Sequence, residues 1–550
     1  MTKASDLFLR CLEAEGVEYV FGVPGEENAD VMMSLLDSPI RFITCHHEQG
    51  AAFMADLYGR MTGKPGVCLG TLGPGASNLL TGVANANMDR SPVVAVTGQG
   101  ATTRLHKESH QASDVVAMFR PVTKWAASIQ DERTLTEIVR KAFKLAMAEK
   151  PGATHIELPE DIAKKQVDDE PIVPPVKVRR PIPDEKAVAA AIALLTEAEQ
   201  PLLLIGNGCV RTRVSKQLAR FVEQTGAYAT TTMMAKGAIS DRDEHSLYMA
   251  GLGSRDHVIA AFEAADVVVA IGYDMVEWHP SKWNVGEPKR LLHIDFEPAE
   301  VDGAYRPHVE IAGDIAATLW AINEGLPEGH RYTYSGVFAK TRELLTYEIL
   351  EEHADDAGFP LTPQRILCDL RAEMADEDVL ISDVGAHKMW TARHYPTYEP
   401  GTCIISNGWC SMGVALPGAI GAKLVHPDRN VVALNGDGGF LMNVQELSTA
   451  VQHGVATVNL VWEDGEYGLI RWKQDMTYGK HSHTELSNPD FVALGEAFGC
   501  HARRVESADE LRPALREAFA VQGKPSVIVI PVDYRENMKL TQRLGQEMPH

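Results

Sequence analysis

Two acidic residues, Asp437 and Asp464, follow runs of apolar residues that predict buried strands. The predicted strands cover Asn430–Leu434 and Thr457–Trp462, and a helical pattern lies between them. A strand–helix–strand unit of this length makes parallel strands with a right-handed crossover, so both strands end at the same edge of a sheet. We therefore expect the two carboxylates to lie close together at the edge where α/β domains bind ligands.

Glycines surround the first of these acids, at Gly436, Gly438 and Gly439. Glycine lets backbone N–H groups approach an anion closely, and Mg²⁺ accepts one or two carboxylates together with phosphate oxygens and water. The pattern therefore indicates a magnesium ion with a phosphate group. The alternative is an ordinary Gly-Asp-Gly turn in which Asp437 caps the next helix, and the tripeptide alone leaves that reading open.

A third acid, Glu48, lies between a predicted strand over Arg41–Cys45 and an alanine-rich predicted helix over Glu48–Thr62. A carboxylate near a helix N-terminus is a common cap that complements the helix dipole. On local grounds the pattern favours this structural role.

The elements that must position these acids fall into three blocks, in which short apolar runs alternate with helical patterns. The blocks cover residues 1–165, 187–327 and 361–550, and the segments 166–186 and 328–360 between them are predicted linkers. The fold class predicted is α/β, with three domains that are each a mostly parallel sheet flanked by helices.

Bulk composition excludes several classes of function. The 550 residues carry a formal net charge of −23, which argues against general binding to nucleic acid or to an anionic membrane. No apolar run reaches membrane-spanning length, and Leu7, Cys11 and Leu12 recur at the spacing of an amphipathic helix, which is not a signal peptide. The eight cysteines show neither a CxxC pair nor metal-ligand spacing, so we expect reduced thiols in a cytoplasmic protein.

The stretch from Gly436-Asp437-Gly438 to Asp464-Gly465-Glu466 resembles the thiamin-diphosphate motif of the decarboxylase and acetohydroxyacid-synthase superfamily. The resemblance implies that Asp437 and Asp464 bind Mg²⁺ through their side chains and Glu466 through its backbone carbonyl. It also implies that the outer domains are the pyrimidine (residues 1–165) and diphosphate (361–550) domains, with a Rossmann-like domain between them. Most members carry Asn at the position of Asp464, and an aspartate there resembles the catabolic, flavin-independent acetolactate synthases.

The segment His47-Glu48-Gln49-Gly50 and its continuation resemble the part of these enzymes that supplies one catalytic glutamate. By this resemblance Glu48 binds N1′ of the cofactor's aminopyrimidine and promotes its imino tautomer. Gly73 and Asn78 lie near the pyrimidine ring, and Gln111 lines the reaction pocket, with His110 a weaker candidate. An exposed loop is the alternative for the segment Leu105–Gln111.

Further residues are implied to grip the cofactor. The backbone N–H groups of Gly385 and Ala386 and the imidazole ring of His387 could bind diphosphate oxygens. An ordinary β–α turn is the alternative there. In the related enzymes a large apolar residue matching Met412 holds the cofactor bent, and Asn407 precedes it. Glycines 436, 438 and 439 approach the diphosphate, and Tyr467 packs near it.

The resemblance implies the decarboxylation of pyruvate and transfer of the remaining two-carbon unit to a second pyruvate, which gives 2-acetolactate. Another 2-oxo-acid decarboxylase or carboligase with a different acceptor is the alternative, because Lys473, next to Trp472, departs from the residues found at this acceptor-selecting position. The segment Ile271–Asn284 resembles the catabolic synthases rather than the flavin-binding ones, and the glycine fingerprint in Leu202–Thr212 lacks its third glycine. The resemblance therefore implies that no FAD binds. The half-sites of the family come from two chains, so we expect at least a homodimer, and a homotetramer as the assembly.

Overall fold

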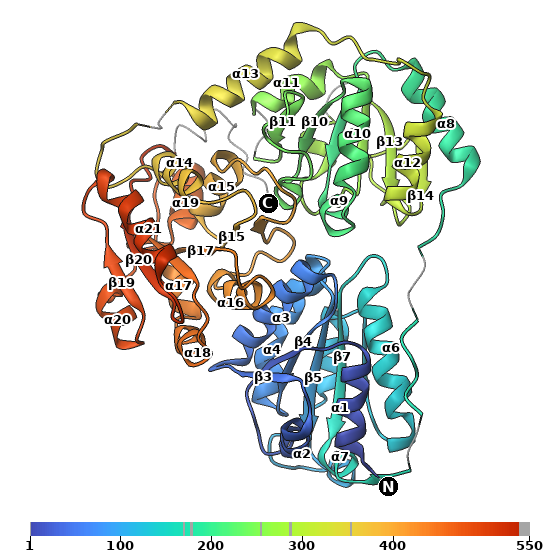
Figure 1. The fold of residues 1–550 in the computed structure, drawn as a ribbon, viewed down its shortest axis with the longest axis vertical. Helices are drawn as coiled ribbons and strands as arrows, with labels where there is room; N and C mark the ends of the chain where they lie inside the picture. Colours follow the sequence, from blue (N-terminus) through green and yellow to red (C-terminus); the bar gives the residue numbers. More distant parts are fainter. Residues whose placement is uncertain are drawn as a thin grey trace.

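Three six-stranded sheets organise the chain, and every strand pair within them is parallel. The computed structural model describes residues 2–168, 171–176, 180–252, 256–284, 289–352 and 355–537. Each sheet with its helices forms one lobe, called here the N-terminal, central and C-terminal lobe, and the three lobes lie around a common junction (Figure 1). The predicted class of three parallel α/β units is confirmed.

The N-terminal lobe has the strand order β3-β2-β4-β5-β7-β6. The glutamate at position 48 is the first residue of α3, as the sequence pattern predicts. The strands are β2 (Tyr19–Gly22), β3 (Arg41–Thr44), β4 (Gly66–Gly70), β5 (Val93–Gln99), β6 (Trp125–Ser128) and β7 (Ala153–Pro159). The helices are α1 (Ala4–Ala14), α2 (Ala29–Ser34), α3 (Glu48–Thr62), α4 (Pro74–Met88), α5 (Val115–Phe119), α6 (Leu135–Met147) and α7 (Glu160–Ala163).

The central lobe has the strand order β11-β10-β9-β12-β13-β14. The two central strands, over Leu202–Ile205 and Val267–Ile271, are buried throughout and consist almost entirely of Leu, Val and Ile, as parallel strands under helices do. The strands are β9 (Leu202–Ile205), β10 (Tyr228–Thr231), β11 (Ser246–Met249), β12 (Val267–Ile271), β13 (Arg290–Asp295) and β14 (Val309–Ala312). The helices are α8 (Glu185–Glu197), α9 (Asn207–Arg211), α10 (Ser215–Thr225), α11 (His257–Ala264) and α12 (Ile315–Gly325).

The C-terminal lobe has the strand order β16-β15-β17-β18-β20-β19. The strands are β15 (Val379–Ser382), β16 (Cys403–Ile405), β17 (Val431–Gly436), β18 (Val458–Glu463), β19 (His501–Arg504) and β20 (Ser526–Pro531). The helices are α14 (Pro363–Glu373), α15 (Ala386–His394), α16 (Ala415–Val425), α17 (Asp437–Met442), α18 (Glu446–Gln452), α19 (Gly468–Tyr478), α20 (Phe491–Ala497) and α21 (Leu511–Ala520). Strands β17 and β18 pair in parallel, so the predicted crossover is present, although two short helices replace the single expected one.

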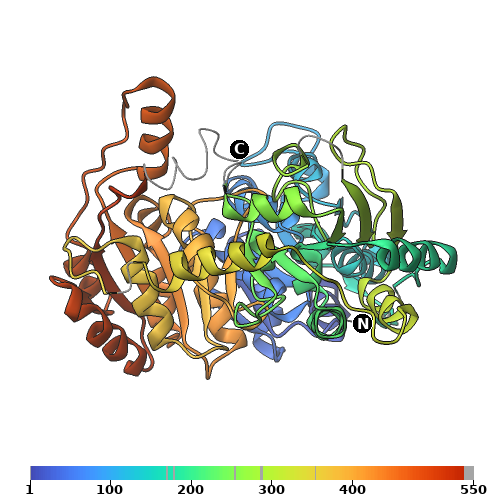
Figure 2. The ribbon, with the colours of Figure 1, turned by 90° about the horizontal axis from the view of Figure 1, so that it is seen from above.

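The segments between the sheets contain more structure than the sequence predicts. In the first predicted linker, the short strand β8 (Gln166–Val167) pairs antiparallel with β1 (Thr2–Lys3). In the second, the segment 328–360 contains a helix, α13 (Gly336–Leu350), that packs on α11, β11 and α15. Phe338, Leu345 and Ile349 recur at helical spacing on its buried side, a periodicity that the polar flanks obscure. Figure 2 shows α13 (yellow) running between the central and C-terminal lobes.

The N-terminal and C-terminal lobes contact each other mainly through α3 and α16, which make the most extensive helix–helix contact of the chain. Small residues allow this close approach, because a methyl group on Gly421 would lie 2.4 Å from the backbone oxygen of Met54. Within the described residues, no helix is both long enough and apolar enough to cross a membrane.

Candidate functional site

The edge of the C-terminal sheet holds Asp437 in a dense set of donors. Asp437 is 1% exposed, and its carboxylate accepts hydrogen bonds from the backbone N–H groups of Gly438 (2.8 Å) and Gly465 (2.7 Å). The side-chain amide of Asn488 donates a third, at 2.7 Å. Gly465 directly follows Asp464, so the crossover does bring the ends of β17 and β18 together, as predicted from the sequence.

The two carboxylates at this edge are both costly to ionise. Burial and the nearby charge of Asp437 raise the pKa of Asp464 to about 8, and burial raises the pKa of Asp437 above its ordinary value. A divalent cation between them would favour both charged forms. Among the described residues no group of three or more His, Cys, Asp or Glu side chains could hold a metal, but a magnesium site completed by phosphate oxygens needs only one or two carboxylates.

Glycines beside the acids are required by close packing. A methyl group on Gly438 would lie 2.8 Å from the ring of Tyr467, and one on Gly439 would lie 2.1 Å from an oxygen of Asp383. A methyl group on Gly436 would approach the ring of His387 to 3.2 Å. The chain at the start of α17 therefore lies close to the predicted residues Tyr467 and His387.

His387 lies near the start of α15 and is buried. Burial lowers the pKa of its ring to about 3, so the ring is neutral, and Nε2 has no hydrogen-bond partner among the described residues. Two further buried atoms near Asp437 and Tyr467, Asn488 Oδ1 and Thr484 Oγ1, also lack one. Buried polar groups are normally paired, so these three atoms fit a polar ligand at this edge. The donors and the two acids fit a magnesium diphosphate.

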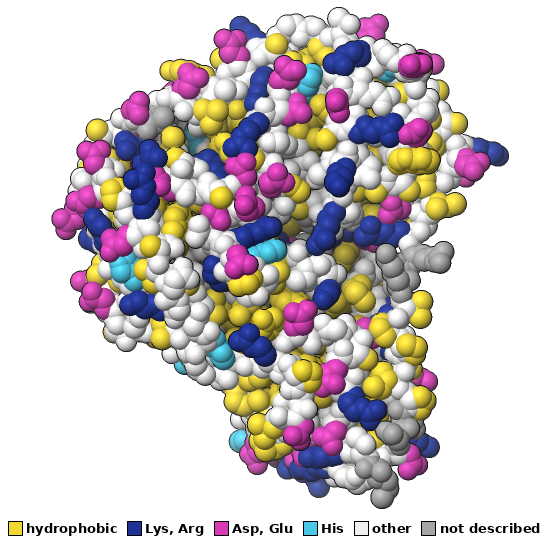
Figure 3. Space-filling model, viewed as in Figure 1, with side chains coloured by type: hydrophobic (Ala, Val, Ile, Leu, Met, Phe, Trp, Pro, Cys, Tyr) yellow, Lys and Arg dark blue, Asp and Glu magenta, His cyan; other side chains and the backbone are white. Residues whose placement is uncertain are grey.

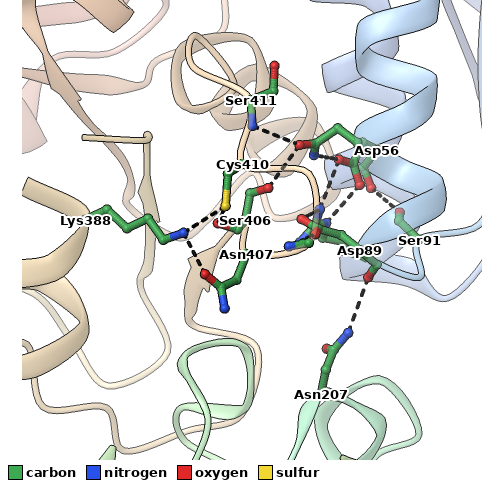
Figure 4. Close-up of polar contacts among 12 residues, drawn as sticks. Asp56, Asp89, Ser91, Asn207, Lys388, Ser406, Asn407, Cys410 and Ser411 are labelled. Atoms are coloured by element: carbon green, nitrogen blue, oxygen red, sulfur yellow. Dashed lines mark hydrogen bonds and ion pairs between the residues drawn. The ribbon is translucent and has the colours of Figure 1, made fainter. Parts of the chain in front are cut away.

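The loop 406–412 between β16 and α16 is held from two sides (Figure 4). The ammonium group of Lys388 donates to Asn407 Oδ1 (2.7 Å) and approaches Cys410 Sγ (3.2 Å). From the N-terminal lobe, Asn85 Oδ1 accepts a hydrogen bond from the hydroxyl of Ser406, at 3.0 Å. The loop ends at Met412, which is half-buried. These contacts fix the backbone on which the predicted residues Asn407 and Met412 lie.

The predicted residues of the N-terminal lobe form a separate group. The side chain of Asn78 donates to Glu48 Oε2 at 2.9 Å, and Glu48 is 8% exposed. Gly73 has a positive φ of 49° and packs on Gln111, because an added methyl group would lie 2.8 Å from the backbone oxygen of that residue. Gln111 itself has a φ of 53° and an exposed side chain, and His110 is exposed too.

Three of the predicted residues follow strand β18. Trp472 and Lys473 lie in α19, and Glu466 lies just before it. Trp472 is buried in the main core cluster of the C-terminal lobe, and its neighbour Lys473 is half-buried. The side chain of Glu466 forms an ion pair with Arg471. The described contacts therefore give Trp472 a packing role and leave Lys473 as the more accessible of the two.

Sequence reasoning missed Asp383 and Asn488. Asp383 follows β15 and accepts hydrogen bonds from the backbone of Gly413 (2.8 Å) and Val414 (3.2 Å), and burial raises its pKa to about 7. An acid directly after a buried strand was the available signal, as it was for Asp437. Asn488 lies in an irregular segment, and no local pattern marks it.

The folding units match a known class of enzyme along most of the chain. Residues 2–118 match the family described as thiamine pyrophosphate enzyme, N-terminal TPP binding domain, residues 188–322 match the central domain, and residues 383–530 match the C-terminal TPP binding domain. The chain belongs to the thiamine pyrophosphate enzymes.

Its relatives narrow the class further. The chain is 35% identical to the acetolactate synthase of Bacillus subtilis (strain 168) over 98% of this chain and 94% of that protein. It is 36% identical to the catabolic acetolactate synthase of Raoultella terrigena over 98% of this chain and 97% of that protein. It is 33% identical to the large subunit of acetolactate synthase isozyme 2 of Escherichia coli (strain K12) over 96% of this chain and 95% of that protein.

Proposed function

We propose that the chain catalyses the condensation of two pyruvate molecules to 2-acetolactate and CO₂, with thiamin diphosphate and Mg²⁺. The observation that carries the proposal is the match over nearly the full length to acetolactate synthases. The burial of Glu48 at the start of α3 and the hydrogen bonds around Asp437 support it. Thiamin diphosphate supplies a carbon nucleophile and an electron sink for the decarboxylation.

In this proposal the sheet edge of the C-terminal lobe holds the diphosphate and the metal. Asp437 and Asp464 would bind Mg²⁺ through their carboxylates, and Glu466 through its backbone carbonyl. The residues with a proposed role at the diphosphate are Gly385, Ala386, His387, Gly436, Gly438, Gly439 and Tyr467. The fit rests on the buried polar atoms that lack partners there and on the close packing of the glycines.

Glu48 is the proposed acid–base group on the aminopyrimidine. Asn78 donates to Oε2, which orients the carboxyl group, and a methyl group on Gly75 would lie 3.0 Å from Oε1, so that side is open only because residue 75 is glycine. A carboxyl group held in a largely buried place, with one oxygen already bound, can hold a proton on the other and exchange it with a ligand nitrogen. Gly73 and Gln111 would line the same half of the site.

Met412 and Asn407 are proposed to hold the cofactor. Lys473 is proposed to shape the substrate end of the site, with Trp472 supporting α19 from within the core and His110 at the margin of the site. The loop contacts of Lys388 hold Asn407, and the half-buried Met412 remains able to contact a ligand. Lys473 can pair with the carboxylate of an acceptor 2-oxo acid.

We further propose that no FAD binds. A dinucleotide would occupy the carboxyl edge of the central sheet, where its strands end. Lys150 from the N-terminal lobe reaches this edge and pairs with Asp274 (2.7 Å) and Asp295 (3.0 Å). Lys150 therefore occupies the place between these two acids that a ribose would take.

The assembly and location remain part of the proposal. Family resemblance supports at least a homodimer, with a homotetramer as the expected assembly. Glu48 accepts a hydrogen bond within the N-terminal lobe and Asp437 accepts its hydrogen bonds within the C-terminal lobe. The eight cysteines are free thiols, which supports a cytoplasmic location.

The test is incubation of the purified protein with pyruvate, thiamin diphosphate and Mg²⁺, with products identified by mass spectrometry. We expect 2-acetolactate and CO₂ in a ratio of about one to one. Acetaldehyde without acetolactate would overturn the proposal. Flavin absorbance in the purified protein would overturn the statement on FAD, and size-exclusion chromatography with light scattering tests the assembly.

A further inference from the structure

A cavity of about 1500 Å³ lies where the three lobes meet, away from the edge that holds Asp437. Its wall includes the end of α3, helices α9 and α10, and the segments 399–405 and 426–429. In Figure 3, Lys and Arg side chains (dark blue) gather where the lower, N-terminal lobe meets the upper part of the molecule. The cavity is large for a small-molecule site, since ligand pockets usually measure about 300–1,000 Å³.

The wall of the cavity is basic, although the chain as a whole carries a net charge of −23. Eight Arg and Lys side chains line it, against four Asp and Glu side chains. A concentration of one sign of charge in a concave, partly enclosed place focuses the potential on a ligand of the opposite sign. The cavity is therefore suited to an anion.

Arg211 gives the clearest sign of a missing partner. Its side chain is 10% exposed and pairs with Glu149 through Nη1 alone, while Nε and Nη2 are buried without a partner among the described residues. Its guanidinium carbon lies 5.8 Å from the centre of the Phe296 ring, and the ion pair with Glu149 holds the group on its other side. Two adjacent N–H donors of a fixed guanidinium are the geometry that binds phosphate in a bidentate manner.

Further cations of the wall lack an acidic partner. Within the described part of the chain, Arg90, Arg213 and Lys216 make no ion pair, and Arg429 donates only to the backbone oxygen of Glu377. Burial, and then the charges of Arg429 and Arg213, lower the pKa of His426, which also lines the cavity. The unpaired charges come from all three lobes.

The ligand need not carry a nucleoside. Lys150 occupies the carboxyl edge of the central sheet between Asp274 and Asp295, which is where an α/β domain takes a ribose. The cavity therefore has donors that can bind phosphate, while the position for a sugar is occupied by Lys150.

We propose that this cavity is an anion-binding site for a small phosphate-bearing molecule of the pyrophosphate class, separate from the site of the catalytic cofactor. Arg211 binds it through Nε and Nη2, and Arg213 and Lys216 pair with it at the rim. A bound anion offsets the repulsion among cations from three lobes, so it stabilises the arrangement of the lobes. The inference does not depend on the reaction that the enzyme catalyses.

The test is isothermal titration calorimetry of the protein saturated with thiamin diphosphate and Mg²⁺, with sodium pyrophosphate as the titrant. We expect binding with one site per chain and a higher melting temperature in its presence. The double variant R213Q/K216Q should weaken binding by about tenfold or more. Both residues are exposed, so the variant should fold. The matched control is R220Q, which removes a half-exposed cation of α10, the helix that also carries Lys216, and should leave the affinity unchanged.

Two further titrants show which kind of phosphate compound the cavity binds. Inorganic phosphate should bind more weakly than pyrophosphate, and adenosine diphosphate should bind no more tightly than pyrophosphate. Three results would each overturn the proposal. The first is that pyrophosphate does not bind, and the second is that it binds R213Q/K216Q and the unchanged protein with equal affinity. The third is that adenosine diphosphate binds tightly while pyrophosphate does not bind. Equal affinity would place the pyrophosphate outside this cavity.

Discussion

The carboxylate of Asp89, at the end of α4 in the N-terminal lobe, accepts the backbone N–H of Gly408 in the C-terminal lobe at 2.7 Å. The same carboxylate pairs with Arg60, which also binds Asp56, and Asn85 joins the cluster through Asp56 (Figure 4). A methyl group on Gly408 would lie 2.7 Å from Asp89 Oδ1, so only glycine fits. The N-terminal lobe therefore holds the loop that carries Asn407 and Met412.

Replacement of Asp89 should loosen this loop. We expect D89A to raise the KM for thiamin diphosphate and to destabilise the fold by about 1–3 kcal/mol, because a buried N–H group and part of a buried guanidinium lose their acceptor. D89N keeps an acceptor for Gly408 and should restore most of the cofactor affinity. Steady-state kinetics and thermal unfolding measure the two effects; equal KM values for D89A and D89N would contradict the role in positioning the loop.

Glu48→Gln tests the proposed acid–base group. The amide keeps the size of the side chain but cannot exchange the proton, so kcat should fall by roughly 10²–10⁴-fold while the fold persists. Turnover with saturating pyruvate and cofactor measures the loss. The control is E18Q in the same lobe, where the acid forms only an exposed pair with Lys64 and should matter little. Near-normal turnover of Glu48→Gln would refute the assignment.

The two acids of the sheet edge should differ in importance. D437N should abolish measurable Mg²⁺-dependent cofactor binding, because Asp437 also accepts two backbone N–H groups and the amide of Asn488. D464N should retain binding at lower affinity, since an amide oxygen still ligates Mg²⁺. Calorimetric titration with thiamin diphosphate and Mg²⁺ measures both, and D131N at an exposed acid is the control. A larger loss in D464N than in D437N would reverse the assigned roles.

Gly439→Ala should disrupt the packing beside Asp437. The added methyl group would lie 2.1 Å from Asp383 Oδ2, and Asp383 is held by backbone N–H groups, so the backbone at the start of α17 must shift. We expect a lower melting temperature and at least about tenfold weaker cofactor binding. G336A is the control, because residue 336 has open space around it and an ordinary φ. An unchanged cofactor affinity in Gly439→Ala would show that this turn tolerates movement.

Glu277 predicts a pH dependence of stability. Burial, and then the charge of Asp274, raise the pKa of its carboxyl from 4.5 to about 8. The folded state holds a proton that the unfolded state releases between these values, so the free energy of unfolding falls as the pH rises through this window. E277Q does not titrate, so its advantage over the unchanged protein should grow from about pH 5 and level off above about pH 8. Calorimetric melting at several pH values measures it; a constant difference would contradict the shift.

The sequence by itself determined the local parts of the site. The apolar runs before Asp437 and Asp464 and the length of chain between them require parallel neighbours, because a crossover of that length returns the chain to the same sheet edge. The same kind of local pattern placed Glu48 at the first residue of α3. Residues within one strand–helix–strand unit share a fixed geometry, which is why spacing alone predicts it.

Only the tertiary structure decided which distant segments meet. Asp89 and Gly408 are separated by 319 residues, and Lys150 reaches Asp274 across 124. The packing of the lobes likewise decides three other features: the helix α13, the burial of Trp472 and the basic cavity. Such contacts depend on the shapes and charges of whole surfaces, and a pattern of a few neighbouring residues carries no information about which surface it will face.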